Sequence, residues 1–259
     1  MLKNIIIKLL LMCRLYNTIK TFKDRFLMIT PSYRQHKIEM KEFYSQFINS
    51  GDLCFDIGAN IGNRTEIFLS LNARVVAVEP QSECLKKLRK TFGENTKLTI
   101  IPKALGQQEG EGTLLQGTVN TISTMSKDWI SKMKESGRFS GHDWHKFIKV
   151  PVTTLDSLIR IYGTPKMCKI DVEGFEPIVL KGLSQPVTYI SFEFNSEVLE
   201  NAIECIYLCS KLGEAVYNYS NGESMKLSLD RWVDKDAIIK ILQSFDKGSF
   251  GDVYAWYIK

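Results

Sequence analysis

One glycine-rich segment constrains the fold of this chain more than any other feature. Residues 53–57 form a short apolar run, and the letters DIGANIG at residues 56–62 continue it into a turn with two glycines. Glycine adopts positive φ at little cost and lets the backbone approach a ligand closely. A helix that follows such a turn offers unpaired N–H groups to a polar ligand. The segment therefore predicts a strand, a ligand-binding turn and a helix.

The same alternation continues toward the end of the chain. Apolar runs predict strands at residues 53–57, 74–78, 98–101, 150–153, 167–170, 188–194, 215–219 and 252–258. Helical segments are expected at residues 63–71, 82–92, 155–161, 175–181, 197–212 and near 234–244. Alternating strands and helices indicate an α/β fold, with a mostly parallel sheet and helices on both of its faces. Such sheets bind ligands at the carboxyl ends of their strands.

Two regions lie outside this alternation. Residues 1–49 form an N-terminal helical extension broken at Pro31, and residues 50–259 form the α/β domain. Within that domain, residues 106–150 are rich in Gly, Ser, Thr and Lys. We expect a hairpin and a mobile insertion there, which acts either as a lid over a site or as a surface decoration.

Charge and cysteine usage limit the compartment and the partners. The net charge is +5, from 34 basic and 29 acidic residues, an excess too small to indicate a nucleic-acid partner. None of the six cysteines forms a C-x-x-C pair, which favours buried free thiols and a cytoplasmic location. Basic residues dominate residues 1–25, so this segment is either a helix in peripheral contact with a membrane or one packed on protein.

Two carboxylates indicate the ligand of the glycine turn. Asp56 ends the first strand and Glu79 ends the second, where a carboxylate can accept both ribose hydroxyls of an adenosine group. A dinucleotide site needs G-x-G-x-x-G for its pyrophosphate, whereas this turn reads G-x-N-x-G behind an aspartate. Asp56 would repel a pyrophosphate and attract the ammonium of a methionine group. The pattern favours S-adenosylmethionine over a nicotinamide dinucleotide.

A second motif, KIDVEG at residues 169–174, supplies candidate catalytic groups. Asp171 follows a buried strand that we expect beside the first one, and its carboxylate could orient a substrate hydroxyl or accept its proton. Asp171 and Glu173 could instead only cap the next helix. Glu193 ends a further strand and is a candidate substrate contact. His142 and His145 of the insertion are rival general bases or inert surface residues, and without ligand partners nearby we expect no metal site.

Together these segments resemble the FkbM family of methyltransferases. The resemblance rests on the DIGANIG turn, the letters VEP at 78–80, PKAL at 102–105, VTTLD at 152–156 and KIDVEG at 169–174, in this order. It covers roughly residues 50–195 and leaves residues 1–49 and much of 106–150 without a counterpart.

The resemblance implies a Rossmann-like class I methyltransferase fold, with a seven-stranded sheet whose last strand is antiparallel. It implies methyl transfer from S-adenosylmethionine to oxygen, commonly a hydroxyl of a sugar, polyketide or other natural product. Asp171 and Glu173 would lie at the reaction centre. The expected cofactor contacts are Asp56, Gly58, Ala59, Asn60, Gly62, Glu79, Pro80, Ala104 and Leu105.

Several alternatives stay open at this point. A nicotinamide-dependent oxidoreductase and a non-catalytic adenosyl-binding protein are the rival functions. The acceptor, described only as a small molecule or glycan, is not identified by the sequence. Neither the oligomeric state nor a metal requirement is predicted.

Overall fold

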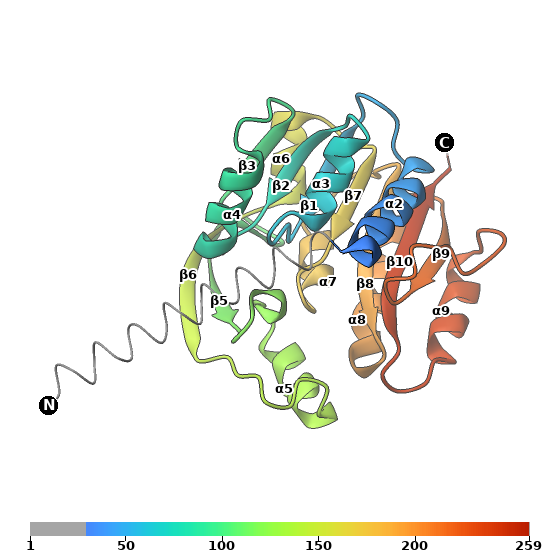
Figure 1. The fold of residues 1–259 in the computed structure, drawn as a ribbon. Helices are drawn as coiled ribbons and strands as arrows, with labels where there is room; N and C mark the ends of the chain where they lie inside the picture. Colours follow the sequence, from blue (N-terminus) through green and yellow to red (C-terminus); the bar gives the residue numbers. More distant parts are fainter. Residues whose placement is uncertain (1–29, 259) are drawn as a thin grey trace, which may run out of the picture. The chain divides into compact units, whose positions relative to one another are not determined.

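The structure, a computed structural model, describes residues 30–258. Its main sheet has seven strands in the order β3-β2-β1-β7-β8-β10-β9 (Figure 1). The strands are β1 (Leu53–Ile57), β2 (Arg74–Val78), β3 (Leu98–Ile101), β7 (Met167–Ile170), β8 (Tyr189–Asn195), β9 (Ala215–Asn221) and β10 (Phe250–Tyr257). β10 runs antiparallel to both of its neighbours, and the other pairs in this sheet are parallel. The predicted seven-stranded sheet with an antiparallel last strand is therefore confirmed.

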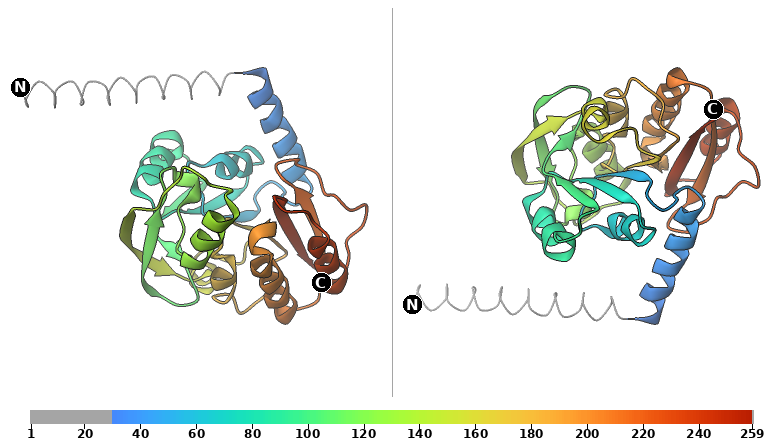
Figure 2. Two further views of the ribbon diagram at one scale, coloured as in Figure 1. Left: turned by 90° about the horizontal axis from the view of Figure 1, so that it is seen from below. Right: turned by 90° about the horizontal axis from the view of Figure 1, so that it is seen from above.

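Helices cover both faces of this sheet (Figures 1 and 2). On one face the apolar side chains of the central strands pack against α6 (Leu155–Tyr162), α7 (Glu176–Leu180), α8 (Leu199–Leu212) and α9 (Lys235–Gln243). The other face is covered by α3 (Asn63–Ser70), α4 (Ser82–Phe92) and the end of α2 (Pro31–Ser45). Strands buried on both faces explain why the central runs of the sequence are continuously apolar.

The strand order places a crevice between β1 and β7. From β1 the chain builds outward through β2 and β3, and it then returns to place β7 on the other side of β1. The loops that leave β1 and β7 therefore diverge at the carboxyl edge of the sheet, which is the usual ligand position in such folds. The backbone N–H of Asp171 donates to the carbonyl of Ile57 at 2.9 Å, so the two loops start side by side.

The region of the expected insertion has its own small sheet. β4 (Ala104–Leu105) and β5 (Gly110–Gln116) both pair with β6 (Lys146–Thr153), β4 in parallel and β5 antiparallel. Between these two strands lie the 3-10 turn η1 (Asn120–Ile122) and α5 (Lys127–Ser136). Trp129 and Trp144 are buried there in an apolar cluster, so much of the region is packed around a core.

At the N-terminus, the described chain begins just before α2, which starts at Pro31 because proline suits the first turn of a helix. Phe43 and Phe47, four residues apart, both pack their rings against Tyr254 of β10. The basic segment of residues 1–25 lies outside the described residues. Among those that are described, no helix is long and apolar enough to cross a membrane.

The cysteines that the structure describes are free and buried, as expected. They are Cys54, Cys84, Cys168, Cys205 and Cys209. Cys13 lies outside the described residues.

Candidate active site

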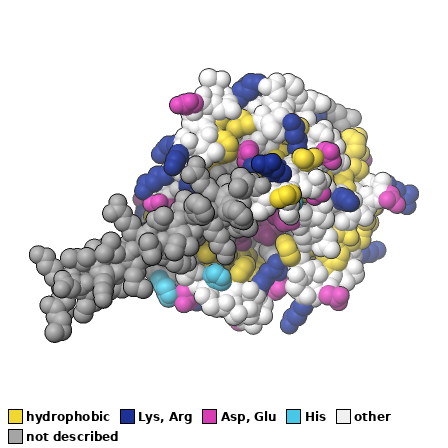
Figure 3. Space-filling model, viewed as in Figure 1, with side chains coloured by type: hydrophobic (Ala, Val, Ile, Leu, Met, Phe, Trp, Pro, Cys, Tyr) yellow, Lys and Arg dark blue, Asp and Glu magenta, His cyan; other side chains and the backbone are white. Residues whose placement is uncertain are grey.

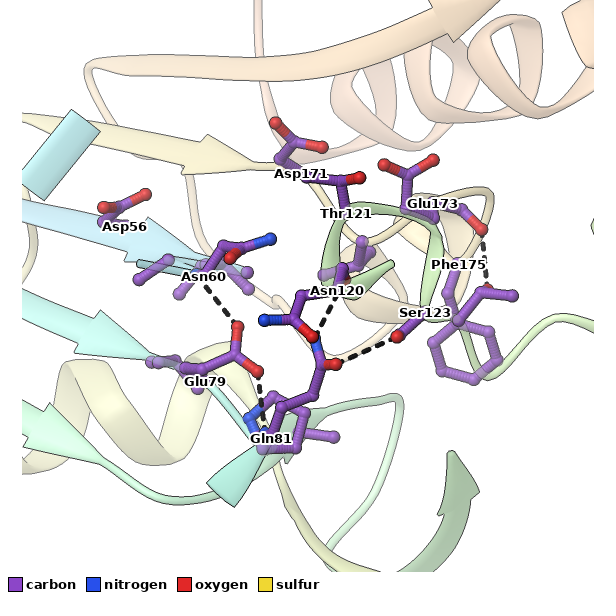
Figure 4. A pocket seen from close by; sticks show the side chains of 18 of the residues that line it. Asp56, Asn60, Glu79, Gln81, Asn120, Thr121, Ser123, Asp171, Glu173 and Phe175 are labelled. Atoms are coloured by element: carbon purple, nitrogen blue, oxygen red, sulfur yellow. Dashed lines mark hydrogen bonds between the residues drawn. The ribbon is translucent and has the colours of Figure 1, made fainter. Parts of the chain in front are cut away.

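A pocket of about 340 Å³ lies at the carboxyl edge of the sheet (Figure 4). The segments after β1, β2, β3 and β7 line it together with Glu193 of β8, and residues 120–125 of the inserted region close one side. Its volume is in the range of small-molecule sites. Figure 4 shows Glu79 and Gln81 in the lower part of the pocket and Asp171 and Glu173 in the upper part.

The first glycine of the turn is required by the protein's own packing. Gly58 has φ +80°, and a Cβ at this position would collide with the backbone oxygen of Asp171. The expected reason for this glycine is the close approach of a ligand, but the loop after β7 already occupies the space that a Cβ would need. The absence of a Cβ at Gly58 therefore lets the two loops of the pocket lie close together.

Glu79 forms the floor at one end of the pocket. Its carboxylate accepts the backbone N–H of Asn60 at 2.9 Å and that of Gln81 at 2.7 Å, one on each oxygen. Each oxygen keeps a second lone pair, so the carboxylate can still accept two hydroxyl groups. Burial raises the pKa of Glu79 to about 7.

Gln81 connects this floor to the inserted region. Its side-chain amide donates to the carbonyl of Asn120 at 3.1 Å and accepts the hydroxyl of Ser123 at 2.9 Å. Asn120 and Ser123 also line the pocket. Sequence reasoning did not find these three residues, because the two segments are 42 residues apart.

Asp56 is buried beneath the glycine turn. Its carboxylate accepts the Thr65 hydroxyl at 2.5 Å, and it pairs in register with Lys169 of β7. Burial raises the pKa of Asp56, and Lys169 and Arg64 oppose that rise. Asp56 thus both fixes the start of α3 and lines the pocket.

At the opposite end, three carboxylates meet. Oxygens of Asp171, Glu173 and Glu193 all lie within 4.8 Å of one another. Burial, reinforced by repulsion between the carboxylates, raises the pKa of Glu173 and of Glu193 well above the ordinary value. Such oxygens can also hold a divalent cation, but nothing else in the described residues points to one.

The backbone of this acidic turn is held in an unusual conformation. Glu173 has φ +54°, a left-handed geometry that is uncommon outside glycine and collects at functional sites. The hydroxyl of Thr124 donates to the carbonyl of Glu173 at 2.6 Å. Gly174 follows with φ +83°, and a Cβ there would collide with Trp129 of α5. The inserted region therefore fixes the position of Glu173.

The positive charge of Lys169 offsets part of the negative charge at this acidic end of the pocket. Its side chain is 2% exposed, and its amine lies 2.8 Å from Asp252 Oδ1 and 3.3 Å from Asp171 Oδ2. Although burial lowers the pKa of Lys169, the two carboxylates raise it well above its ordinary value, so the residue is a cation. The sequence feature that could have pointed to Lys169 is a lysine inside an otherwise apolar predicted strand.

The model of the methyltransferase FkbM domain matches residues 56–208, more than half of the chain and nearly every residue of this pocket. The protein belongs to the FkbM methyltransferase family. Membership confirms the Rossmann-like class I fold and identifies S-adenosylmethionine as the cofactor. It also disfavours the nicotinamide-dependent alternative.

A curated relative and several solved structures resemble this FkbM protein. Hexuronic acid methyltransferase AglP of Haloferax volcanii is 26% identical over 143 residues, which are 54% of this chain and 54% of the relative. The chain thus spans about half the length of that relative.

Among solved structures, precorrin-6y C5,15-methyltransferase of Geobacter metallireducens has a TM-score of 0.46 at 9% identity, over 85% of this chain and 86% of its own. An S-adenosylmethionine-dependent O-methyltransferase of Thermotoga maritima has a TM-score of 0.41 at 10% identity, over 85% of this chain and 65% of its own.

Most residues expected to contact the cofactor of this FkbM protein line the pocket. They are Asp56, Gly58, Ala59, Asn60, Glu79, Pro80, Ala104 and Leu105, and the catalytic and substrate candidates Asp171, Glu173 and Glu193 join them. Gly62 does not line it; this residue precedes α3 with φ +97° and packs against Leu88 and Phe92 of α4.

The two histidines are not brought to the pocket. His142 Nδ1 lies 2.7 Å from the hydroxyl of Thr118, and neither ring lines the pocket. His145 is 78% exposed and faces Asp143 at 3.2 Å. Since a general base must reach the proton it accepts, this placement gives neither histidine support as the base.

Proposed function

We propose that this FkbM protein transfers a methyl group from S-adenosylmethionine to a hydroxyl oxygen of a sugar, glycan or natural-product acceptor. The supporting observation is the position of the carboxylates of Asp171, Glu173 and Glu193 in the same pocket as the glycine turn and Glu79. A group that binds adenosine and a group that can hold a hydroxyl therefore share one cavity.

The residues of the pocket fit S-adenosylmethionine along its length. Glu79 would accept the ribose hydroxyls on its remaining lone pairs. Apolar side chains that include Ala104, Leu105 and Leu114 would contact the adenine. Asp56 and Asn60 would face the methionine end. When bound, S-adenosylmethionine supplies an electrophilic methyl group on a sulfonium.

Alignment and proton removal are what the chain must add. The acceptor oxygen needs to be held in line with the methyl group, which contributes on the order of 7–11 kcal/mol at best. Asp171, the acidic-end carboxylate that pairs with Lys169, would orient the hydroxyl and accept its proton. General-base help of this kind contributes roughly 10²–10⁴-fold in rate.

The chemistry of the acidic end favours a hydroxyl-rich acceptor. Carboxylates accept hydrogen bonds from hydroxyl groups, and Glu193 would contact a second hydroxyl beside the reacting one. The printed name of the Haloferax volcanii relative supports a sugar acceptor. On the face seen in Figure 3, lysine and arginine side chains are scattered and form no single stripe. A small-molecule or glycan acceptor is therefore proposed, in place of nucleic acid.

Methyl transfer from tritium-labelled S-adenosylmethionine tests this proposal. Neutral monosaccharides and oligosaccharides, hexuronic acids and RNA are incubated in parallel with the full chain and with Asp171→Asn. We expect label in a sugar with the full chain and a large loss with the variant. Label in RNA alone, or equal label with both proteins, would contradict the proposal.

Location is a separate proposal. We infer a cytoplasmic enzyme in peripheral membrane contact through residues 1–25, which would bring a lipid-linked acceptor within reach. Deletion of residues 1–25 should then reduce the fraction that sediments with vesicles. An unchanged sedimenting fraction would contradict the proposed membrane contact.

A further inference from the structure

Arg64 faces the pocket and has no part in the function proposed so far. It is the second residue of α3, and it lines the cavity together with Glu223 from the loop after β9. Arg64 Nη2 and Glu223 Oε2 are 2.7 Å apart. The two residues are 159 positions apart in the chain, so no local pattern links them.

The two partners of this ion pair differ strongly in exposure. The side chain of Arg64 is 15% exposed and that of Glu223 is 60% exposed. An exposed carboxylate contributes little to an ion pair, typically about 0–1 kcal/mol, and can leave it at small cost. A buried guanidinium, in contrast, needs an anion, and its planar donors match a carboxylate in two-point geometry. Another carboxylate could therefore take the place of Glu223.

The charged residues that line the pocket indicate which carboxylate could replace Glu223. Among residues 30–258, the basic side chains lining the pocket are Arg64 and Lys103, whereas the acidic ones include Asp56, Asp171, Glu173 and Glu193. The carboxylates suit the ammonium and sulfonium of S-adenosylmethionine, but they would repel its carboxylate.

Position then selects between the two cations. Lys103 directly precedes Ala104, at the end of the pocket expected to hold adenine. Arg64 precedes Thr65, which donates to Asp56 at the end expected to hold methionine. Burial raises the pKa of Asp56 and Arg64 opposes that rise, so the two side chains interact. The cation at the methionine end is thus Arg64.

We propose that Arg64 binds the α-carboxylate of S-adenosylmethionine, and that Glu223 competes with this carboxylate for the same guanidinium. The inference rests on the proposed function, since it assumes this cofactor in this pocket. Glu223 would make cofactor binding weaker than the pocket alone allows. It would also couple the loop after β9 to cofactor entry.

Calorimetric titration with two matched ligands tests this role. S-adenosylmethionine and its decarboxylated form share the adenosine, sulfonium and ammonium groups and differ in the carboxylate. Arg64→Gln should weaken binding of S-adenosylmethionine by roughly 10- to 100-fold, as expected for one charge-assisted pair, and leave the decarboxylated ligand within about twofold. Glu223→Gln should strengthen binding of S-adenosylmethionine without changing the decarboxylated ligand.

The second variant keeps the test decisive if Arg64→Gln does not fold, because Glu223 is exposed. Equal losses for both ligands with Arg64→Gln, or no gain with Glu223→Gln, would overturn the inference while the proposed function stands. Absence of binding of either ligand to the unmodified, folded chain would overturn both.

Discussion

The amine of Lys169 lies 2.8 Å from Asp252 Oδ1, although β8 separates the strands that carry them. Lys169 thus contacts Asp252 of β10 across β8, and its amine also lies 3.3 Å from Asp171 Oδ2 of the pocket. Asp171 sits at the open end of this chain of charges, with a side chain that is 41% exposed.

Removal of this cation should destabilise the fold. Lys169→Met leaves Asp252 buried without its partner, and the free energy of unfolding should fall by about 3–5 kcal/mol in urea titrations. The matched control is Lys181→Met, which breaks the 2.7 Å pair with Glu204 on the surface and should cost no more than about 1 kcal/mol. Equal losses for the two variants would contradict the buried network.

Asp171→Asn should lower kcat by about 10²–10⁴-fold with an acceptor found by the labelled-methyl assay, because the amide cannot accept the hydroxyl proton. Binding of S-adenosylhomocysteine should be retained. His142→Ala and His145→Ala test the rival bases in the same assay. If either histidine variant lowers kcat as much as Asp171→Asn does, that histidine becomes the better candidate for the general base.

Cofactor affinity should depend on pH through Glu79. Burial raises the pKa of this carboxyl to about 7, and ribose hydroxyls donate to its ionised form. Binding therefore favours loss of the proton, so affinity for S-adenosylhomocysteine should fall as pH drops below 7, by at most tenfold per unit. Glu176, whose pKa is also raised to about 7 by burial, could add to the slope. The variant Glu79→Gln separates the two residues, since it should remove the contribution of Glu79 to the pH dependence of affinity. An unchanged pH dependence in this variant would contradict the role of Glu79.

The contact between the two loops of the pocket is testable at Gly58. Gly58→Ala places a Cβ against the backbone oxygen of Asp171, and we expect lost cofactor binding and a lower Tm. Gly51→Ala is the control: it has φ +88° but no atom within 4 Å of the added Cβ. It should show only the modest backbone penalty of a left-handed residue, about 1–2 kcal/mol. Similar effects at both positions would mean that the collision is unimportant.

The sequence predicts four strands of the sheet at their observed bounds. Residues 53–57, 74–78 and 167–170 are strands inside the sheet, where burial on both faces makes the runs mostly apolar, and residues 98–101 form the half-buried edge strand. β6 begins at Lys146, four residues before the expected run at 150, because its first half is largely exposed and carries polar side chains.

Within the site, carboxylates at strand ends are predictable, since every parallel strand delivers its last residues to the same edge. Partners from distant segments are not. Gln81 and Ser123 meet across 42 residues, Lys169 and Asp252 across 83, and Arg64 and Glu223 across 159. These pairs depend on the insertion, on β10 and on the loop after β9, whose positions no local pattern encodes.

The most direct test of the account is calorimetric titration of the purified chain with S-adenosylmethionine and S-adenosylhomocysteine, beside Glu79→Ala and a nicotinamide dinucleotide. We expect micromolar binding of both adenosyl ligands, clear weakening by Glu79→Ala and no binding of the dinucleotide. Well-folded protein that binds the dinucleotide, or that binds neither adenosyl ligand, would contradict it.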